Sequence, residues 1–224
     1  MVDISTLHSM LIEMHGGMLT LATICILAII LDRIYLKTSG TNNKEAGFWS
    51  TASDMGKLAR FTEPTAYVAG IGGIIGLILS AIVGTYAWPI ELLTSSALGT
   101  IGWTKVMFSI FATELWIIFV FLRTKYGENL WKNTNTAIMN SCVGILGFLF
   151  MVIAGSLGAH MTDIANMTEK GSVIDPIFEL FGIDPLNFGV TESNFIIALI
   201  IGSIIFIIVP VAVVVYTQRQ NKVI

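Results

Sequence analysis

The sequence predicts an all-α fold: an integral membrane bundle of five transmembrane helices. Of the 224 residues, 54% are hydrophobic and only 12% are charged, whereas about a quarter of the residues in a soluble domain are charged. The mean hydropathy is +0.80, and the apolar residues form continuous runs instead of the alternating pattern of barrel strands. These features exclude an ordinary soluble enzyme, a disordered chain and a nucleic-acid-binding protein with a basic patch.

Five runs reach the length of about 20 residues that a helix needs to cross a bilayer core about 30 Å thick. The predicted spans are 9–31, 65–87, 103–122, 138–159 and 195–216. The first run is too long for the core of a signal peptide, and no basic residue precedes it, so we expect an uncleaved helix. The second and fourth runs are rich in glycine, the third carries Glu114, and the fifth is interrupted only by Pro210 near its end.

These spans leave two long connections within a single membrane domain of residues 1–224: a cytoplasmic loop at 32–64 and an outer loop at 161–194. A short surface helix is expected at 47–60. Another is expected at 177–183, where an apolar stretch lies between two Asp-Pro turns.

Basic residues set the predicted orientation. Ten of the twelve lysines and arginines lie on one side of the predicted spans, and only Lys105 and Lys170 lie on the other. The positive-inside rule therefore places the N-terminus outside and the C-terminus in the cytoplasm. We expect a multi-pass protein of a prokaryotic plasma membrane, with its functional end on the extracytoplasmic side.

All three histidines, His8, His15 and His160, fall on that outer side. His8 and His15 are seven residues apart, which places them about 20° apart on one helix face and about 10 Å apart along its axis. They cannot bind the same small metal ion, so each needs a ligand partner from another helix. A histidine from the first helix and one from the fourth could hold a haem b iron axially. His15 with His160 is the preferred pair because His15 is embedded in its span, although His8 matches the depth of His160 better.

Copper is the alternative cofactor. Met10, Met14 and Met18 recur every four residues around the same histidines, and Met161 follows His160. Thioether and imidazole ligands suit copper, although methionine in a membrane helix is also an ordinary apolar filler. The third interpretation is that the histidines only pack between helices.

Glu114 stands in the middle of the third span. Lipid solvates a charge poorly, so we expect this carboxyl group to face the bundle interior and to be neutral or paired. It could serve as a proton relay or quinone contact, or it could simply hydrogen-bond to a neighbouring helix.

Glycines in the second and fourth spans allow close helix packing, as in Gly72-x-x-x-Gly76, or could make room for a flat cofactor. Cys25 and Cys142 are expected to be buried thiols within the first and fourth helices.

Four short segments occur in this order within residues 7–160: Leu7-His-Ser-Met-Leu-Ile-Glu-Met-His15, Gly84-Thr-Tyr-Ala-Trp88, Phe121-Leu-Arg123 and Gly155-Ser-Leu-Gly-Ala-His160. Together they resemble a widespread prokaryotic family of small four-helix membrane proteins of unassigned function. This sequence departs from that family in two ways. Its opening histidines are seven apart, where those of the family are closer and each is followed by proline, and it adds a fifth helix. The resemblance implies a haem or redox role.

Motifs for hydrolysis or phosphoryl transfer are absent. The leading prediction is therefore an integral membrane subunit of a redox or electron-transfer system that holds haem b near the outer face. The first alternative is a cofactor-free accessory subunit of a larger membrane enzyme, such as a copper-dependent oxidase or monooxygenase. The second is a metal or small-solute permease. The expected partners are the lipid bilayer and other membrane subunits, with no nucleic acid.

Overall fold

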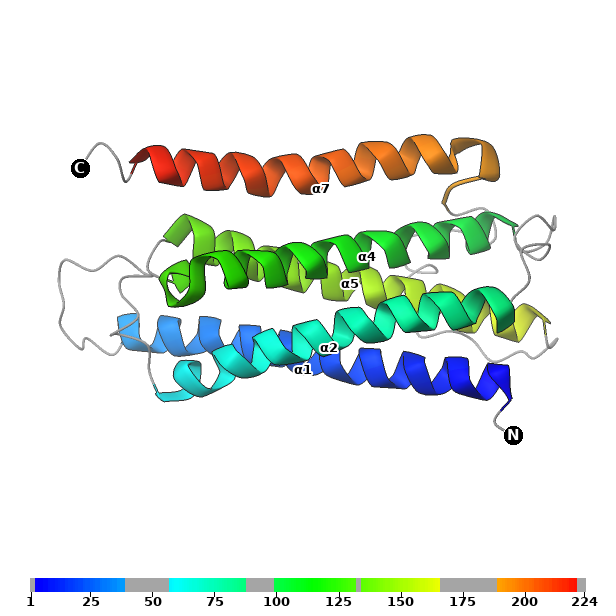
Figure 1. The fold of residues 1–224 in the computed structure, drawn as a ribbon, viewed down its shortest axis with the longest axis horizontal. Helices are drawn as coiled ribbons and strands as arrows, with labels where there is room; N and C mark the ends of the chain where they lie inside the picture. The colour runs from blue at the N-terminus through cyan, green and yellow to red at the C-terminus, as the bar shows by residue number, and fades with distance from the viewer. Residues whose placement is uncertain (1–2, 39–56, 88–98, 132–133, 166–188, 221–224) are drawn as a thin grey trace.

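The computed structural model describes residues 3–38, 57–87, 99–131, 134–165 and 189–220, and these form a bundle of long helices (Figure 1). The elements in chain order are α1 (Ile4–Thr38), α2 (Lys57–Ala87), α4 (Gly99–Tyr126), the short 3-10 helix η2 (Gly127–Trp131), α5 (Thr134–Ala165) and α7 (Glu192–Gln220). No strand occurs among these residues. Five of the helices are long and apolar enough to cross a membrane, which confirms the predicted fold class.

Each long helix runs antiparallel to the one before it (Figure 1). As a result, the start of α1 and the end of α5 lie at the same end of the bundle, which we call the histidine end because it holds His8 and His160. The opposite end, where α4 finishes, is called the arginine end because it holds Arg33 and Arg123. The bundle therefore brings the histidine-bearing termini of two helices to one end, as expected from the order of the spans.

The helices extend beyond the predicted spans. Residues 57–63, expected in a loop, form the first two turns of α2. At the start of α1, the Asp3 carboxylate accepts hydrogen bonds from the Ser5 hydroxyl group and from the first backbone N–H groups, and these bonds lower the pKa of Asp3. Most of the predicted surface helix at 47–60, and all of the one at 177–183, lie outside the described residues.

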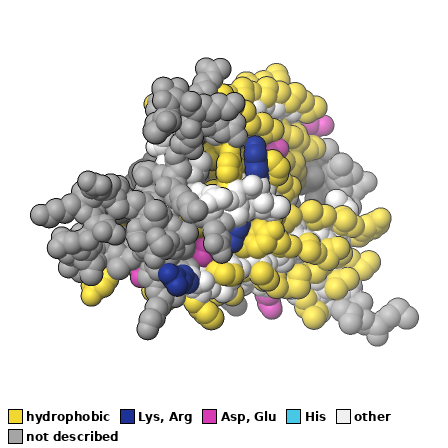
Figure 2. Space-filling model, turned by 60° about the vertical axis from the view of Figure 1, so that its left-hand side comes forward, with side chains coloured by type: hydrophobic (Ala, Val, Ile, Leu, Met, Phe, Trp, Pro, Cys, Tyr) yellow, Lys and Arg dark blue, Asp and Glu magenta, His cyan; other side chains and the backbone are white. Residues whose placement is uncertain are grey.

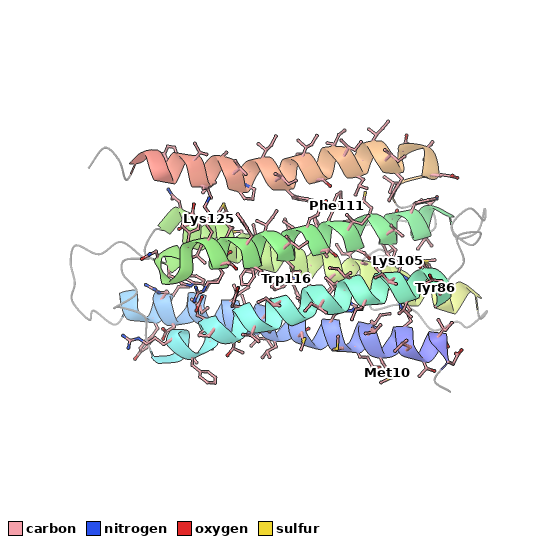
Figure 3. The ribbon with its side chains drawn as sticks, viewed as in Figure 1. Met10, Tyr86, Lys105, Phe111, Trp116 and Lys125 are labelled. Atoms are coloured by element: carbon pink, nitrogen blue, oxygen red, sulfur yellow. The ribbon has the colours of Figure 1, made fainter. Side chains whose placement is uncertain are left out.

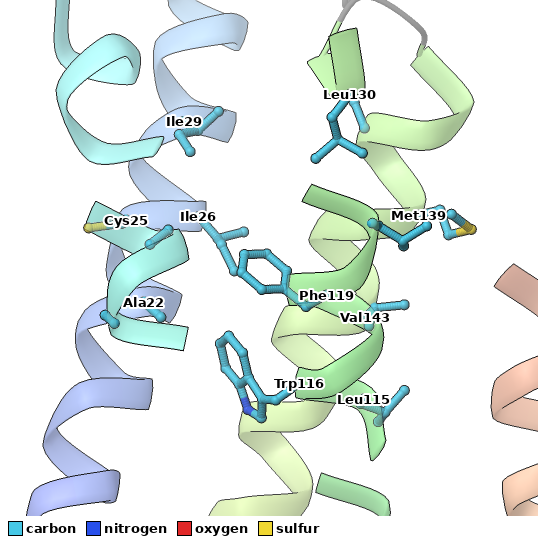
Figure 4. Packing of buried hydrophobic residues seen from close by; sticks show 14 of the residues in the cluster. Ala22, Cys25, Ile26, Ile29, Leu115, Trp116, Phe119, Leu130, Met139 and Val143 are labelled. Carbon is cyan, nitrogen blue, oxygen red and sulfur yellow. The ribbon is translucent and has the colours of Figure 1, made fainter. Parts of the chain in front are cut away.

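Helices α1, α2, α4 and α5 share a core toward the arginine half of the bundle (Figure 4). Leu19, Ala22, Ile26 and Ile29 recur every three or four residues along α1 and are buried. They contribute to one cluster with Trp116 and Phe119 of α4. Apolar side chains cover much of the described surface in Figure 2, as expected where lipid is the solvent.

Helix α7 lies along one side of the other four helices (Figure 1). Only 6% of the residues in its most apolar stretch are buried, against 28–39% in the other four helices. It contacts α4 and α5 through a row of aromatic residues that includes Trp103 on Phe195 and Phe111 on Phe206. The fifth helix is therefore a peripheral addition to a four-helix core.

Candidate functional site

The histidine face of α1 packs directly against the glycine face of α2. A Cβ atom added at Gly76 would lie 2.7 Å from His15 Cβ, and one added at Gly84 would lie 2.8 Å from His8 Cε1. A Cβ atom at Gly72 would lie 2.4 Å from the sulfur of Met18. Side chains of α1 therefore fill the space that these glycines leave, so close helix packing explains them and no flat cofactor is needed at this face.

The His8 side chain takes part in a polar cluster built from several helices. Its Nδ1 atom lies 3.5 Å from the Ser80 hydroxyl oxygen on α2. The Lys105 ammonium group of α4 is close enough to interact with it electrostatically. Lys105 also lies against α5, because a Cβ atom at Gly158 would be 3.1 Å from its Nζ atom. We call His8, Ser80 and Lys105 the histidine-end cluster (Lys105 is labelled in Figure 3).

His15 lies one layer deeper in the bundle and is 7% exposed. Its Nδ1 atom is 2.8 Å from the backbone carbonyl oxygen of Leu11, so this nitrogen carries the proton and donates the hydrogen bond. Both α1 histidines thus use Nδ1 for a hydrogen bond, and neither Nε2 atom has a hydrogen-bond partner among the described residues. When Nδ1 donates its proton, as it does in His15, the imidazole presents Nε2 as a lone-pair ligand, as is common at metal centres. His8 does the same in the tautomer whose Nδ1 donates to Ser80.

The helix register determines which α1 histidine matches the depth of His160. A Cβ atom at Gly144 would lie 2.5 Å from Ile26 Cδ1, so these two residues of the antiparallel helices α1 and α5 are level. From Ile26 to His8 is 18 residues, and from Gly144 to His160 is 16. At 1.5 Å per residue, His160 therefore differs in depth by about 3 Å from His8 and by about 7.5 Å from His15. The register favours His8 as its counterpart.

The four methionines of the copper alternative point in different directions. Met10 is 58% exposed on the surface of α1 (Figure 3), whereas Met161 is buried on α5. Met14 and Met18 lie against the glycine face of α2. Among the described residues, no three His, Cys, Asp or Glu side chains gather as a metal-binding group.

Glu114 lies away from the histidine end, at the contact between α4 and α7. The Ser203 hydroxyl group of α7 donates a hydrogen bond of 2.7 Å to Glu114 Oε1. The other carboxyl oxygen, Oε2, is buried and has no hydrogen-bond partner in the described part of the chain. One turn away, Phe111 lies against Gly202, so Glu114 contributes to the contact that holds α7.

The sequence reasoning missed a buried polar centre at the arginine end. Glu63 of α2 is bonded to Arg123 of α4: Arg123 Nη2 donates to Oε2 at 2.9 Å, and Arg123 Nε donates to Oε1. The indole N–H of Trp131 also donates to Oε1, at 3.3 Å. Glu63 falls in the predicted loop 32–64 because the apolar run begins only after Pro64, and a carboxylate paired with a distant, half-buried arginine leaves no periodic signal. From the sequence, Lys105 contributes only a charge to the predicted orientation.

A groove of about 780 Å³ lies between α5 and α7 toward the arginine end. Its lining is almost entirely apolar and includes Met139, Val143, Phe206 and Val209. Cys142 also lines it and is exposed, so the expectation of a buried thiol holds for Cys25 but is wrong for Cys142. The reason is that Cys142 lines the open groove between α5 and α7, where neighbouring side chains do not cover it.

Protein-family models, curated proteins and solved structures were all compared with the chain, and none of them matches it. The site is therefore interpreted from its own geometry.

Proposed function

We propose that this protein is an integral membrane subunit of a redox system and that its histidine end binds haem b. The observation that carries the proposal is the hydrogen bond from His15 Nδ1 to the Leu11 carbonyl oxygen, which leaves His15 Nε2 as a ligand atom, with His8 Nδ1 beside Ser80 at the same end. Buried ionisable groups are unfavourable within a membrane protein and usually mark a functional site. Lys105, which lies against Gly158 of α5 and acts electrostatically on His8, adds a cation that would suit an acidic group of the ligand.

We place haem b along the α1–α5 side of the bundle, which requires the His8 ring to turn away from Gly84 of α2. The α1–α2 contact is closed, because a Cβ atom at Gly76 or Gly84 would collide with a histidine. In this proposal His160 of α5 would hold the haem together with His8, which lies closer to it in depth, or with His15, which the sequence favours. When bound, the iron would supply one-electron transfer, and the protein would hold and orient the imidazoles.

Haem content in single variants tests the ligand set. We expect His160→Ala to lower the haem retained by purified protein at least about tenfold, since one axial ligand is lost. We expect the same loss in either His8→Ala or His15→Ala, and the variant that loses haem identifies the partner of His160. Ser80→Ala should weaken haem binding if His8 is that partner, because Ser80 orients its ring. The matched control is Tyr86→Phe, an exposed position at the same end. Full haem content in all three histidine variants would exclude these ligands.

A second candidate is a cofactor-free accessory subunit of a larger membrane enzyme. The exposed surface of α7 supports it, because isoleucines and valines cover this helix on nearly every side. Colourless protein that purifies in fixed stoichiometry with other subunits would favour this candidate. If such protein contained copper, that result would support the methionines of α1 as copper ligands.

A further inference from the structure

One outward-facing stripe of α1 differs from the rest of its lipid-facing surface. It consists of Ser9, Glu13, Gly16, Gly17 and Thr20, which we call the Glu13 face. At 100° per residue these positions fall within an arc of about 100° on one side of the helix, roughly opposite His15. Ser9, Glu13, Gly17 and Thr20 are exposed. A Cβ atom added at Gly16 or Gly17 would meet nothing within 4 Å.

The Glu13 carboxyl group lies at the depth of the hydrocarbon core. Gly144 faces both Ile26 of α1 and Phe119 of α4, so those two residues are level. Phe119 is about 10 Å along α4 from the middle of that helix, toward the arginine end. Because Ile26 is level with Phe119, the middle of the bundle lies about 10 Å along α1 from Ile26, near Thr20. Glu13 is then about 10 Å from the middle on the histidine side, within the half-thickness of about 15 Å.

No hydrogen bond or ion pair within the described residues involves Glu13. The Ser9 and Thr20 hydroxyl groups differ from it, because each donates to a backbone carbonyl group one turn earlier in α1. An acidic side chain directed into lipid is unfavourable, and such residues in membrane helices are normally paired with another group. The surrounding small residues would let a second helix approach closely.

We infer that the Glu13 face receives a transmembrane helix of a partner subunit that carries a lysine or arginine at the depth of Glu13. Charge complementarity selects this occupant: a second copy of the chain would bring one Glu13 against another. This inference rests on the proposal that the protein is a subunit of a complex, but it involves none of the haem ligands. The contact combines close packing of small residues with one charge-assisted hydrogen bond.

A model transmembrane peptide tests the inference. The probe is a single-span polyleucine peptide with one lysine at the depth of Glu13 and two glycines four residues apart beside it. The reference peptide has methionine in place of the lysine. Association with full-length protein is measured by fluorescence energy transfer in phosphatidylcholine vesicles. We expect the lysine peptide to bind about tenfold more tightly than the reference peptide.

Variants of the protein locate the contact. Glu13→Gln should remove the preference for lysine, and Gly17→Ile should weaken binding of both peptides. Gly155→Ile is the matched control, because Gly155 is exposed on α5 with the same open space but no carboxylate beside it. Equal binding of the two peptides to the wild-type protein would overturn the inference. Self-association of the protein that Gly17→Ile abolishes would also overturn it, because the occupant would be a second copy.

Haem content is measured in parallel and separates the two proposals. A lysine preference in protein that binds no haem would support the Glu13 face and contradict the haem site. Haem-containing protein without a lysine preference would contradict the Glu13 face alone.

Discussion

Glu63 and Arg123 lie 60 residues apart in the chain and face each other across α2 and α4 through two hydrogen bonds. Trp131 adds a third bond to the same carboxylate, so a single acidic side chain ties together α2, α4 and η2. The Arg123 guanidinium group also lies over the Tyr67 ring, 5.7 Å from its centroid. Tyr67 in turn is hydrogen-bonded to Thr124 at 2.9 Å. These contacts set the register of α2 against α4 at the arginine end.

Removing one member of this ion pair should destabilise the protein strongly. We expect Glu63→Ala to lower the free energy of unfolding by about 3 kcal/mol, because it leaves the half-buried Arg123 charge without its acceptor. Unfolding in mixed micelles of dodecyl maltoside and dodecyl sulfate, followed by circular dichroism, measures this change.

The double variant Glu63→Leu with Arg123→Leu should be less destabilised than the sum of the two single variants, since no charge is then left uncompensated. Lys125→Ala, an exposed cation two residues from Arg123, serves as the control and should change stability by less than about 0.5 kcal/mol. Additive effects of Glu63→Leu and Arg123→Leu would show that the pair does not act as a unit.

Three Gly→Ala variants should differ in stability according to the atoms that the new methyl group contacts. Gly76→Ala places it 2.7 Å from His15 Cβ and 3.3 Å from the backbone of α1, so the helices must separate. We expect a loss of about 1–3 kcal/mol for this variant. Gly72→Ala meets the flexible end of Met18, which can move, so its effect should be smaller.

Gly155→Ala meets nothing within 4 Å and should leave stability unchanged or slightly raised, since alanine favours the helix. Thermal unfolding in detergent of the three variants checks this order. Equal melting temperatures for Gly76→Ala and Gly155→Ala would contradict direct contact between α1 and α2.

The hydrogen bond between Ser203 and Glu114 should hold α7 to the core. Ser203→Ala removes the side-chain hydrogen bond that joins α7 to α4 at this level and should weaken docking of α7 by about 0.6 kcal/mol, the typical value for such a bond in a membrane protein. Amide hydrogen exchange should then rise in α7 and stay unchanged in α1 and α2. Ser109→Ala is the matched control, because the Ser109 hydroxyl group bonds within its own helix. Faster exchange throughout the bundle would contradict a local role for Ser203.

The sequence was sufficient to predict the five helices because lipid imposes length and apolarity on every spanning segment. It also placed His8 and His160 at one end, since alternating helices return to the same side. It did not reveal the contacts that define the site. The positions of His8 on Gly84 and of Lys105 beside Gly158 depend on how far one helix slides along another. Glycine spacing permits several such registers, and only packed side chains select one of them.

Glu63 shows a different limit. Its position before the apolar run resembles that of a loop residue, and the partner that explains its burial lies 60 residues away. For the same reason, a pattern along the chain could not distinguish the exposed Cys142 from the buried Cys25.

The reduced-minus-oxidised absorption spectrum of the purified wild-type protein shows whether the histidine end binds haem b. We expect a Soret band and the visible bands of a b-type haem, which disappear in His160→Ala while the helical circular dichroism is retained. A folded wild-type protein without these bands, purified from cells supplied with haem, would contradict the proposed function.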